Sequence, residues 1–277
     1  MKYVTLPDGE HVPALGMGTW RMGERHTSRE AEIAALQYGI DLGLTLIDTA
    51  EMYGDGGAEE VVGAALRGRR GQVFLVSKVY PHNATRHGTI TACEHSLRRL
   101  GVDCIDLYLL HWPGATPLAE TVTAFEQLQR DGSIRHWGVS NLDIGEMAEL
   151  ATVAGGARCA TDQVLYNLSR RGVEWDLLPW CREHGMPLMA YSPVEQARLL
   201  EHAPLQKLAR GLGMSPAQLA LAWLLSREQV IAIPKAGALR HLDDNRAALD
   251  VTLTADTLAE LDRLFPPPRR ASPLAML

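Results

Sequence analysis

The stretch IDLYLLHWPGATPLAETVTAFEQLQRDG, residues 105–132, contains one complete strand–helix unit. Its first six residues, Ile105–Leu110, are nearly all apolar, as expected of a strand that is buried on both faces of a parallel sheet. The amphipathic segment Pro117–Asp131 follows, and Gly132 marks its end. A short buried strand joined to a covering helix is the repeating unit of α/β proteins.

The same unit recurs on both sides of this stretch, at a spacing of about 30 residues, which is the size of a βα unit. Short apolar runs predict eight strands: Gly16–Thr19, Leu44–Ile47, Val73–Ser77, Ile105–Leu110, Ile134–Val139, Cys159–Gln163, Pro187–Tyr191 and Ile231–Ile233. Helices are predicted between and after them: Ser28–Leu42, Ala58–Leu66, Thr85–Leu100, Pro117–Asp131, Ile144–Ala154, Val173–Glu183, Leu205–Leu212, Pro216–Ser226, Leu239–Leu249 and Ala255–Leu264.

Eight such units in one chain favour an α/β fold of the closed (β/α)8 TIM-barrel type over an open doubly wound sheet. Before the first unit, Tyr3–Leu6 and Glu10–Val12 flank the turn residues Pro7-Asp8-Gly9, a pattern that predicts an N-terminal β-hairpin. No linker or low-complexity segment interrupts the series. We therefore expect residues 1–277 to form a single barrel domain with extra helices and a short C-terminal tail.

The composition favours a cytoplasmic protein that binds neither nucleic acid nor membranes. The chain has 27 basic and 33 acidic residues, a net charge of −6, which gives no electrostatic footprint for nucleic acid or anionic lipid. Neither a signal peptide nor an 18-residue apolar segment is present. The four cysteines, which form no CxxC pair, are expected to stay reduced: Cys93, Cys104, Cys159 and Cys181.

Four ionisable side chains follow three successive strands of the predicted barrel. Asp48 and Tyr53 come after the second strand, Lys78 after the third and His111 after the fourth, and reactive groups of such barrels lie at these strand ends. An ammonium favours a neighbouring phenolate, so Lys78 is expected to lower the pKa of Tyr53 from about 10. Asp48 would keep the ammonium charged, and His111 would orient a carbonyl oxygen. Each residue alone could be a cap or a packing residue, but the four together favour acid–base catalysis of carbonyl reduction.

Side chains at the later strand ends suit a nicotinamide cofactor. Ser140, Asn141 and Gln163 offer hydroxyl and amide groups that match a carboxamide, and Tyr191 offers a ring for stacking. Lys235, just past the eighth strand, can meet a phosphate. Capping of the strand ends explains these residues as well, and without further information it is the simpler interpretation.

Several short motifs resemble those of the aldo-keto reductase family, in the same order and from Gly16 to about Asn245. The resemblance implies that Tyr53 is the general acid/base, that Lys78 and Asp48 tune it, and that His111 orients the substrate. It also implies a nicotinamide bound in the barrel mouth, which fits the absence of a GxGxxG loop. The motifs are GMGTW (16–20), IDTAEMYG (47–54), VSK (76–78), LLHWP (109–113), GVSN (138–141), Gln163, AYSP (190–193) and IPK (233–235).

The resemblance also assigns further cofactor residues, Ser192 and Pro193 of the AYSP motif among them. Many family members have an arginine six residues after the last-strand lysine that holds the adenosine 2′-phosphate, whereas here His241 stands there with Arg240 before it. Asn245 matches the family's adenine-contacting asparagine. Lys235 is a point cation suited to a phosphate monoester, so NADP(H) is the expected cofactor and NAD(H) the alternative.

The resemblance further implies small substrates and a monomer. The short tail after Leu264 predicts an open mouth, with aromatic and apolar walls from Trp20, Met52, Tyr80 and Trp112. The IPKAG variant (233–237) and the PPP…PLAML tail resemble a bacterial branch that includes methylglyoxal reductases. The expected function is NADP(H)-dependent reduction of small aldehydes, ketones or dicarbonyls. The alternatives are a non-catalytic NADP-binding sensor on the same fold and a metal-dependent hydrolase, which the lack of any HxH pair disfavours, so no metal is expected.

Overall fold

A computed structural model describes residues 1–24, 28–235 and 237–277 of the chain. Its centre is an eight-stranded sheet in the order β10-β9-β8-β7-β6-β5-β4-β3, and every pairing in it is parallel. The strands are β3 (Gly16–Gly18), β4 (Leu46–Asp48), β5 (Phe74–Val79), β6 (Ile105–Leu110), β7 (Ile134–Ser140), β8 (Asp162–Leu165), β9 (Leu188–Tyr191) and β10 (Val230–Ala232).

Two isolated bridges bring the first and last strands of this sheet together and nearly close it into a barrel. They pair Leu15 with Ala232 and Gly18 with Lys235, and the Gly18 N–H donates to the carbonyl oxygen of Pro234 at 3.0 Å. A Cβ at Gly18 would lie 3.0 Å from the carbonyl oxygen of Ile233, so the close approach favours glycine here. The predicted (β/α)8 barrel is confirmed.

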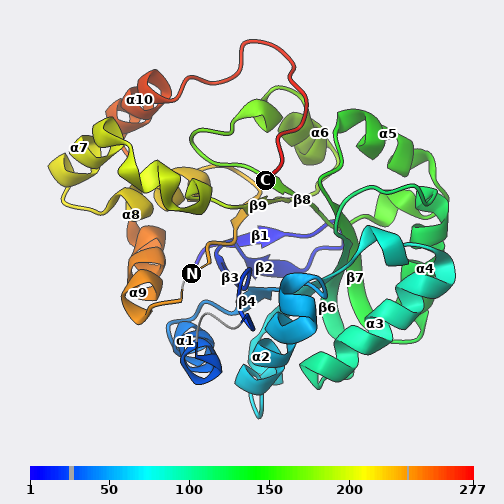
Figure 1. Ribbon diagram of the computed structural model, residues 1–277. Helices are drawn as coiled ribbons and strands as arrows, with labels where there is room; N and C mark the ends of the chain where they lie inside the picture. The colour runs from blue at the N-terminus through cyan, green and yellow to red at the C-terminus, as the bar shows by residue number, and fades with distance from the viewer. Residues whose placement is uncertain (25–27, 236) are drawn as a thin grey trace.

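Ten α-helices in the described part of the chain surround the sheet (Figure 1). Ser28 and Thr85 cap α1 and α3 as predicted, because their hydroxyls accept from the N–H groups of Ala31 and Gly88. The helices are α1 (Arg29–Asp41), α2 (Gly57–Ala65), α3 (Arg86–Leu100), α4 (Leu118–Arg130), α5 (Ile144–Thr152), α6 (Leu177–Glu183), α7 (Ala203–Gly211), α8 (Pro216–Leu225), α9 (Leu239–Ala247) and α10 (Ala255–Leu264).

Most predicted bounds differ from those in the structure by at most two residues, and two elements differ by more. The strand expected at Cys159–Gln163 begins only at Asp162, because a 3₁₀ turn at Gly156–Arg158 delivers the chain to the sheet later than the apolar run suggests. The helix expected at Val173–Glu183 is split into a 3₁₀ turn, Gly172–Glu174, and α6. Trp175 and Asp176 separate the two. Asp176 has non-helical backbone angles, with φ of −139° and ψ of −53°, and its side chain accepts from the Leu177 N–H.

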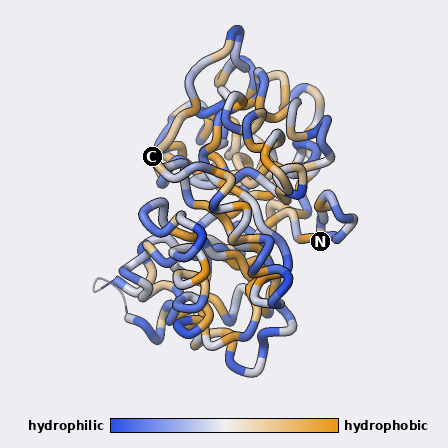
Figure 2. The backbone as a smooth tube through the Cα atoms, turned by 90° about the vertical axis from the view of Figure 1, so that its right-hand side faces the viewer, coloured by the Kyte–Doolittle hydropathy of each residue, from blue (hydrophilic) through white to orange (hydrophobic). Residues whose placement is uncertain are grey.

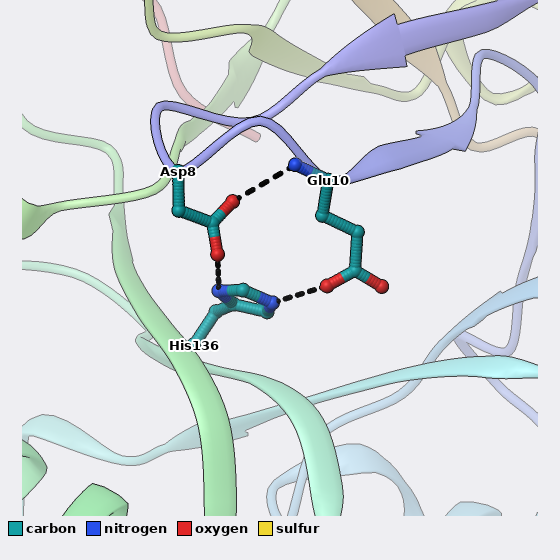
Figure 3. A group of neighbouring side chains, drawn as sticks. All are labelled: Asp8, Glu10 and His136. Carbon is teal, nitrogen blue, oxygen red and sulfur yellow. Dashed lines mark hydrogen bonds and ion pairs between the residues drawn. The ribbon is translucent and has the colours of Figure 1, made fainter.

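The predicted N-terminal hairpin consists of β1 (Tyr3–Thr5) and β2 (His11–Pro13), which pair antiparallel. It lies across the end of the barrel at which the strands begin, since Thr5 exchanges hydrogen bonds with the side chain of Gln229, just before β10. His136, near the start of β7, inserts between two hairpin carboxylates (Figure 3). Its Nδ1 lies 3.4 Å from Asp8 and its Nε2 2.7 Å from Glu10. The hairpin, held by His136, covers this end of the barrel, so the opposite end, at which the strands finish, is the mouth.

The C-terminal tail ends at the mouth, on the side of the molecule away from the hairpin (Figure 2). Its backbone crosses the helices and turns inward to β8 and β9 (Figure 1), and the Leu277 N–H lies against the hydroxyl of Tyr191. The tail therefore ends beside Tyr191, and the openness of the mouth stays a prediction. Separately, none of the helices in residues 1–24, 28–235 and 237–277 has the length and apolar character needed to cross a membrane.

A carboxyl group is buried inside the sheet, on Asp162 of β8, without a compensating charge. The residue has no exposed surface, and neither of its carboxyl oxygens has a hydrogen-bond partner of good geometry among the described residues. Burial raises the pKa of Asp162 well above its usual value, and the Leu142 N–H opposes this only in part. The folded protein therefore keeps this carboxyl protonated at pH values at which a carboxyl in water is ionised.

Asp162→Asn is expected to raise the free energy of unfolding, by an amount that grows with pH. The folded state keeps a proton that the unfolded chain releases above a pKa of about 3.9, so wild-type stability falls as pH rises, by about 1.4 kcal/mol per unit between the two pKa values. The asparagine variant lacks this proton uptake. Urea unfolding from pH 5 to pH 8 measures the difference.

The exposed Asp103 offers a matched control for this measurement. Asp103→Asn should leave the pH dependence of unfolding as in wild type. An Asp162→Asn variant whose stability followed the wild-type pH dependence would contradict the assignment of a buried neutral acid.

Candidate active site

Asp48 and Lys78 form a buried ion pair at the mouth. Asp48 ends β4 and Lys78 lies inside β5, one residue before its end and not after the strand as predicted. The Lys78 ammonium donates to the Asp48 carboxylate at 2.8 Å and to the carbonyl oxygen of Thr49 at 2.9 Å. Burial lowers the pKa of Lys78, and the adjacent carboxylate opposes this effect. The pair places one oriented positive charge beneath the mouth.

Tyr53 lies above this pair, in the turn between β4 and α2. Its hydroxyl is 3.4 Å from the Lys78 ammonium. The expected lowering of the Tyr53 pKa is wrong, because burial, with a smaller contribution from the Asp48 charge, raises the pKa of Tyr53 well above its usual value. The residue is therefore a neutral phenol that holds its proton, which is the state that a proton donor needs.

His111 follows β6 directly and faces Tyr53 across the mouth. The two rings meet edge to face, with centroids 5.6 Å apart. Burial lowers the pKa of His111 to about 2, and the Lys78 charge adds to this effect. The imidazole is therefore neutral and carries a single N–H. The structure brings together all four residues that the sequence singled out: Asp48, Tyr53, Lys78 and His111.

A hydrogen-bonded row of polar side chains continues from this group across β7, β8 and β9. Ser140 donates to the carbonyl oxygen of Gln163 at 2.7 Å, and Asn141 donates to the Ser140 hydroxyl at 3.1 Å and accepts from the Tyr191 hydroxyl at 3.0 Å. Gln163 was predicted to end its strand but is the second residue of β8. Its amide reaches the Asp48 carboxylate at 2.8 Å, which joins the row to the ion pair.

Asn141 adopts a left-handed backbone conformation, with φ of 61°. Asparagine tolerates this conformation better than most residues, and here it turns the side chain toward the mouth. The Asn141 amide also donates to the backbone carbonyl oxygen of His111 at 3.2 Å. The backbone therefore departs from regular strand or helix geometry at Asn141, the residue whose side-chain amide faces the mouth.

The remaining predicted cofactor residues lie beyond β9 and β10. Pro193 and Asn245 are buried, whereas Lys235 is exposed. Arg240 and His241 lie in the first turn of α9, exposed and 3.3 Å apart through Arg240 Nε and His241 Nε2. Ser192 has a left-handed φ of 47°. Ala236, within the IPKAG stretch, lies outside the described residues.

The four predicted wall residues fall into two pairs. Tyr80 and Trp112 meet edge to face at 5.0 Å, and Trp112 also contacts His111, with centroids 4.8 Å apart. Trp20 and Met52 are more exposed, at 37% and 45%. The structure therefore joins one aromatic pair to His111 and leaves the other two side chains more exposed.

Sequence reasoning missed two charged groups behind the mouth. Glu59, on the buried face of α2, has no exposed surface and accepts from Ser77 and Arg99, at 2.6 Å in each case. Its position among the apolar residues Ala58, Val61 and Val62 could have indicated a buried carboxylate, and a buried carboxylate needs a hydrogen-bonding or charged partner.

The second missed group follows β9. Glu195 accepts from Asn167 and Arg170 at 2.8 and 2.9 Å and begins a run of three left-handed residues, Glu195–Ala197. The run contains no glycine, so the sequence carried no signal for this conformation.

Comparison with known proteins adds independent information. The family model described as Aldo/keto reductase family matches residues 14–265. Methylglyoxal reductase YeaE of Escherichia coli (strain K12) is 54% identical to this chain, with coverage of 100% of this chain and 99% of that protein. Glyoxal reductase of Bacillus subtilis (strain 168) is 32% identical, with coverage of 94% and 92%.

Solved structures agree with this result. The crystal structure of an aldo/keto reductase from Klebsiella pneumoniae in complex with NADP and acetate superposes with a TM-score of 0.97 at 54% identity and covers 100% of this chain and 99% of that one. A structure from the same organism in complex with NADPH gives the same values. The likeness therefore extends over the barrel, its mouth and the tail.

Proposed function

The chain belongs to the aldo/keto reductase family, and from this premise we propose that it reduces methylglyoxal and related small carbonyl compounds to alcohols. It is an NADP-dependent oxidoreductase, and the bound cofactor supplies the hydride that reduces the carbonyl carbon. The observation that carries the proposal is the Lys78 ammonium, fixed by Asp48 and Thr49 and aimed at the hydroxyl of Tyr53.

The four clustered residues have different roles in the reduction of the carbonyl. Tyr53 gives its proton to the developing alkoxide, and its raised pKa keeps that proton in place until it is needed. The neutral His111 donates its N–H to the carbonyl oxygen and orients it. Lys78, held by Asp48, places a positive charge where the phenol loses its proton.

The row across β7 to β9 fits a nicotinamide. The amides and hydroxyl of Asn141, Gln163 and Ser140 match the donors and acceptors of a carboxamide. The half-buried ring of Tyr191 offers a stacking face. These residues would hold the nicotinamide, which supplies the hydride when it is bound.

The rest of the cofactor follows the chain beyond β9 and β10. Ser192 and Pro193 border the diphosphate, and Lys235 meets a phosphate. Arg240 and His241, at the start of α9, surround the 2′-phosphate, since a helix N-terminus favours an anion. Asn245 contacts the adenine.

Small substrates fit the walls of the mouth. Tyr80 and Trp112 form one aromatic side, and Trp20 and Met52 form the rim. The chain, residues 1–277, works as one domain and as a monomer. It works in the cytoplasm, where its four free cysteines stay reduced.

NADPH oxidation at 340 nm, with methylglyoxal and an aromatic aldehyde, tests the proposal. We expect turnover with both aldehydes and a preference for NADPH over NADH of about tenfold or more, because a charge-assisted contact to the 2′-phosphate contributes about 1.5–3 kcal/mol. Tight NADPH binding without turnover of any small carbonyl would contradict the proposal. Equal use of NADH would contradict the roles of Arg240 and His241 alone.

A further inference from the structure

The side chain of Glu51 joins the two loops that form the mouth. Glu51 lies two residues before Tyr53, and one of its carboxylate oxygens accepts from the backbone N–H of Tyr80 at 2.7 Å and from the side-chain amide of Asn83 at 3.0 Å. The side chain is largely buried, with 12% exposed. The loop after β4 is thereby tied to the segment after β5.

Glu51 also lies near the positive charge of Arg99, which in turn pairs with Glu59. Arg99, near the end of α3, lies 3.9 Å from its second oxygen and 2.6 Å from Glu59. Glu59 in turn accepts from Ser77, the residue before Lys78. Arg99 packs closely on the turn after Tyr53, since a Cβ at Gly56 would lie 2.5 Å from Arg99 Cδ. Through Arg99 and Glu59, Glu51 is therefore linked to β5, the strand that carries Lys78, and to the turn that follows Tyr53.

The group that Glu51 fixes is an aromatic wall. Tyr80 stacks on His82 with centroids 4.6 Å apart and meets Trp112 edge to face, and Trp112 contacts His111. Glu51 accepts from the Tyr80 backbone N–H and does not contact the ring, so it fixes the position of the Tyr80 backbone from which the ring extends. A shift of this segment would move the wall relative to Tyr53 and leave the Lys78–Asp48 pair in place.

We propose that Glu51 is a positioning residue for substrate binding, which sets the distance between the catalytic tyrosine and the Tyr80–Trp112 wall. The inference rests on the proposed function, because it takes this wall as the substrate side of the mouth. Glu51 acts through its acceptor oxygen, since its two hydrogen bonds, at 2.7 and 3.0 Å, come from neutral N–H donors, whereas the Arg99 guanidinium is 3.9 Å away. A glutamine, whose amide oxygen can accept both bonds, therefore preserves the role, and an alanine removes it.

The test compares Glu51→Ala with Glu51→Gln, using methylglyoxal and benzaldehyde as substrates. Loss of two hydrogen bonds predicts a KM for benzaldehyde about tenfold higher in the alanine variant. The change for methylglyoxal should be smaller, because a three-carbon substrate covers less of the wall. The kcat for methylglyoxal and the NADPH dissociation constant, followed by protein fluorescence, should stay within about twofold of wild type. Glu51→Gln should match wild type.

Asn83→Ala gives a second variant that removes only one of the two bonds, and it should give an intermediate benzaldehyde KM. This variant keeps the proposal testable if Glu51→Ala does not fold. Unchanged benzaldehyde KM values in the folded variants, or a parallel loss of kcat for both aldehydes, would overturn the positioning role while wild-type turnover upheld the proposed function. Absence of turnover in wild type would overturn both.

Discussion

Tyr53→Phe is expected to lower kcat for carbonyl reduction by about 10²–10⁴-fold, the usual contribution of a positioned general acid. The variant keeps the ring that faces His111 and loses only the hydroxyl 3.4 Å from the Lys78 ammonium. Without this hydroxyl, a proton from another source would have to reach the developing alkoxide. Single-turnover kinetics with pre-bound NADPH would isolate the chemical step.

Cofactor binding provides the internal control for this variant. The residues assigned to the nicotinamide lie on β7, β8 and β9 or, in the case of Asn141, directly after β7, so the NADPH dissociation constant should stay within about twofold of wild type. Near-normal turnover by Tyr53→Phe would overturn the assigned mechanism. A large loss of NADPH affinity would show instead that the hydroxyl helps to shape the cofactor site.

Lys78→Met is expected to damage both activity and stability. The change leaves the buried Asp48 carboxylate with the Gln163 amide as its remaining side-chain donor, and breaking a buried pair from one side costs about 3–5 kcal/mol. The rate should fall about as steeply as in Tyr53→Phe, because residues that act as a unit have non-additive effects. Urea unfolding and steady-state kinetics measure the two losses separately.

The double variant Asp48→Asn/Lys78→Met separates these two roles. It removes both charges at once, so we expect it to regain more than about 1.5 kcal/mol of the stability that Lys78→Met loses. The rate should remain low, because the oriented positive charge is still absent. Additive stability losses would contradict a tightly coupled pair, and recovery of the rate would contradict the role of the charge.

The periodic part of the fold could be predicted from the sequence, because burial on both faces leaves a clear apolar run. Ile105–Leu110 has the same bounds in prediction and structure, and the capping residues Ser28 and Thr85 were identified from their position before an amphipathic run. The residue at which a strand begins within an apolar run could be predicted less accurately. Cys159 and Ala160 are apolar and buried but precede β8, since burial is not confined to strands.

The four catalytic candidates could be predicted because each lies at or beside a strand end, and such ends converge in a barrel. The pKa of Tyr53 could not, because it depends on how deeply the loop buries the phenol, and that depth is set by tertiary packing. Glu51 escaped notice for a similar reason. Its partners, Tyr80, Asn83 and Arg99, are distant in sequence and follow no spacing rule.

The way in which β3 meets the segment around β10 to close the barrel also has a consequence for biosynthesis. Among the described residues, β3 finds its second neighbour in the segment from Ala232 to Lys235, so a chain that emerges from the ribosome N-terminus first carries an unpaired sheet edge until this segment has been made. Such an edge invites pairing with other nascent chains. β3 is only three residues long and two of them are glycine, so it offers a poor template for such pairing.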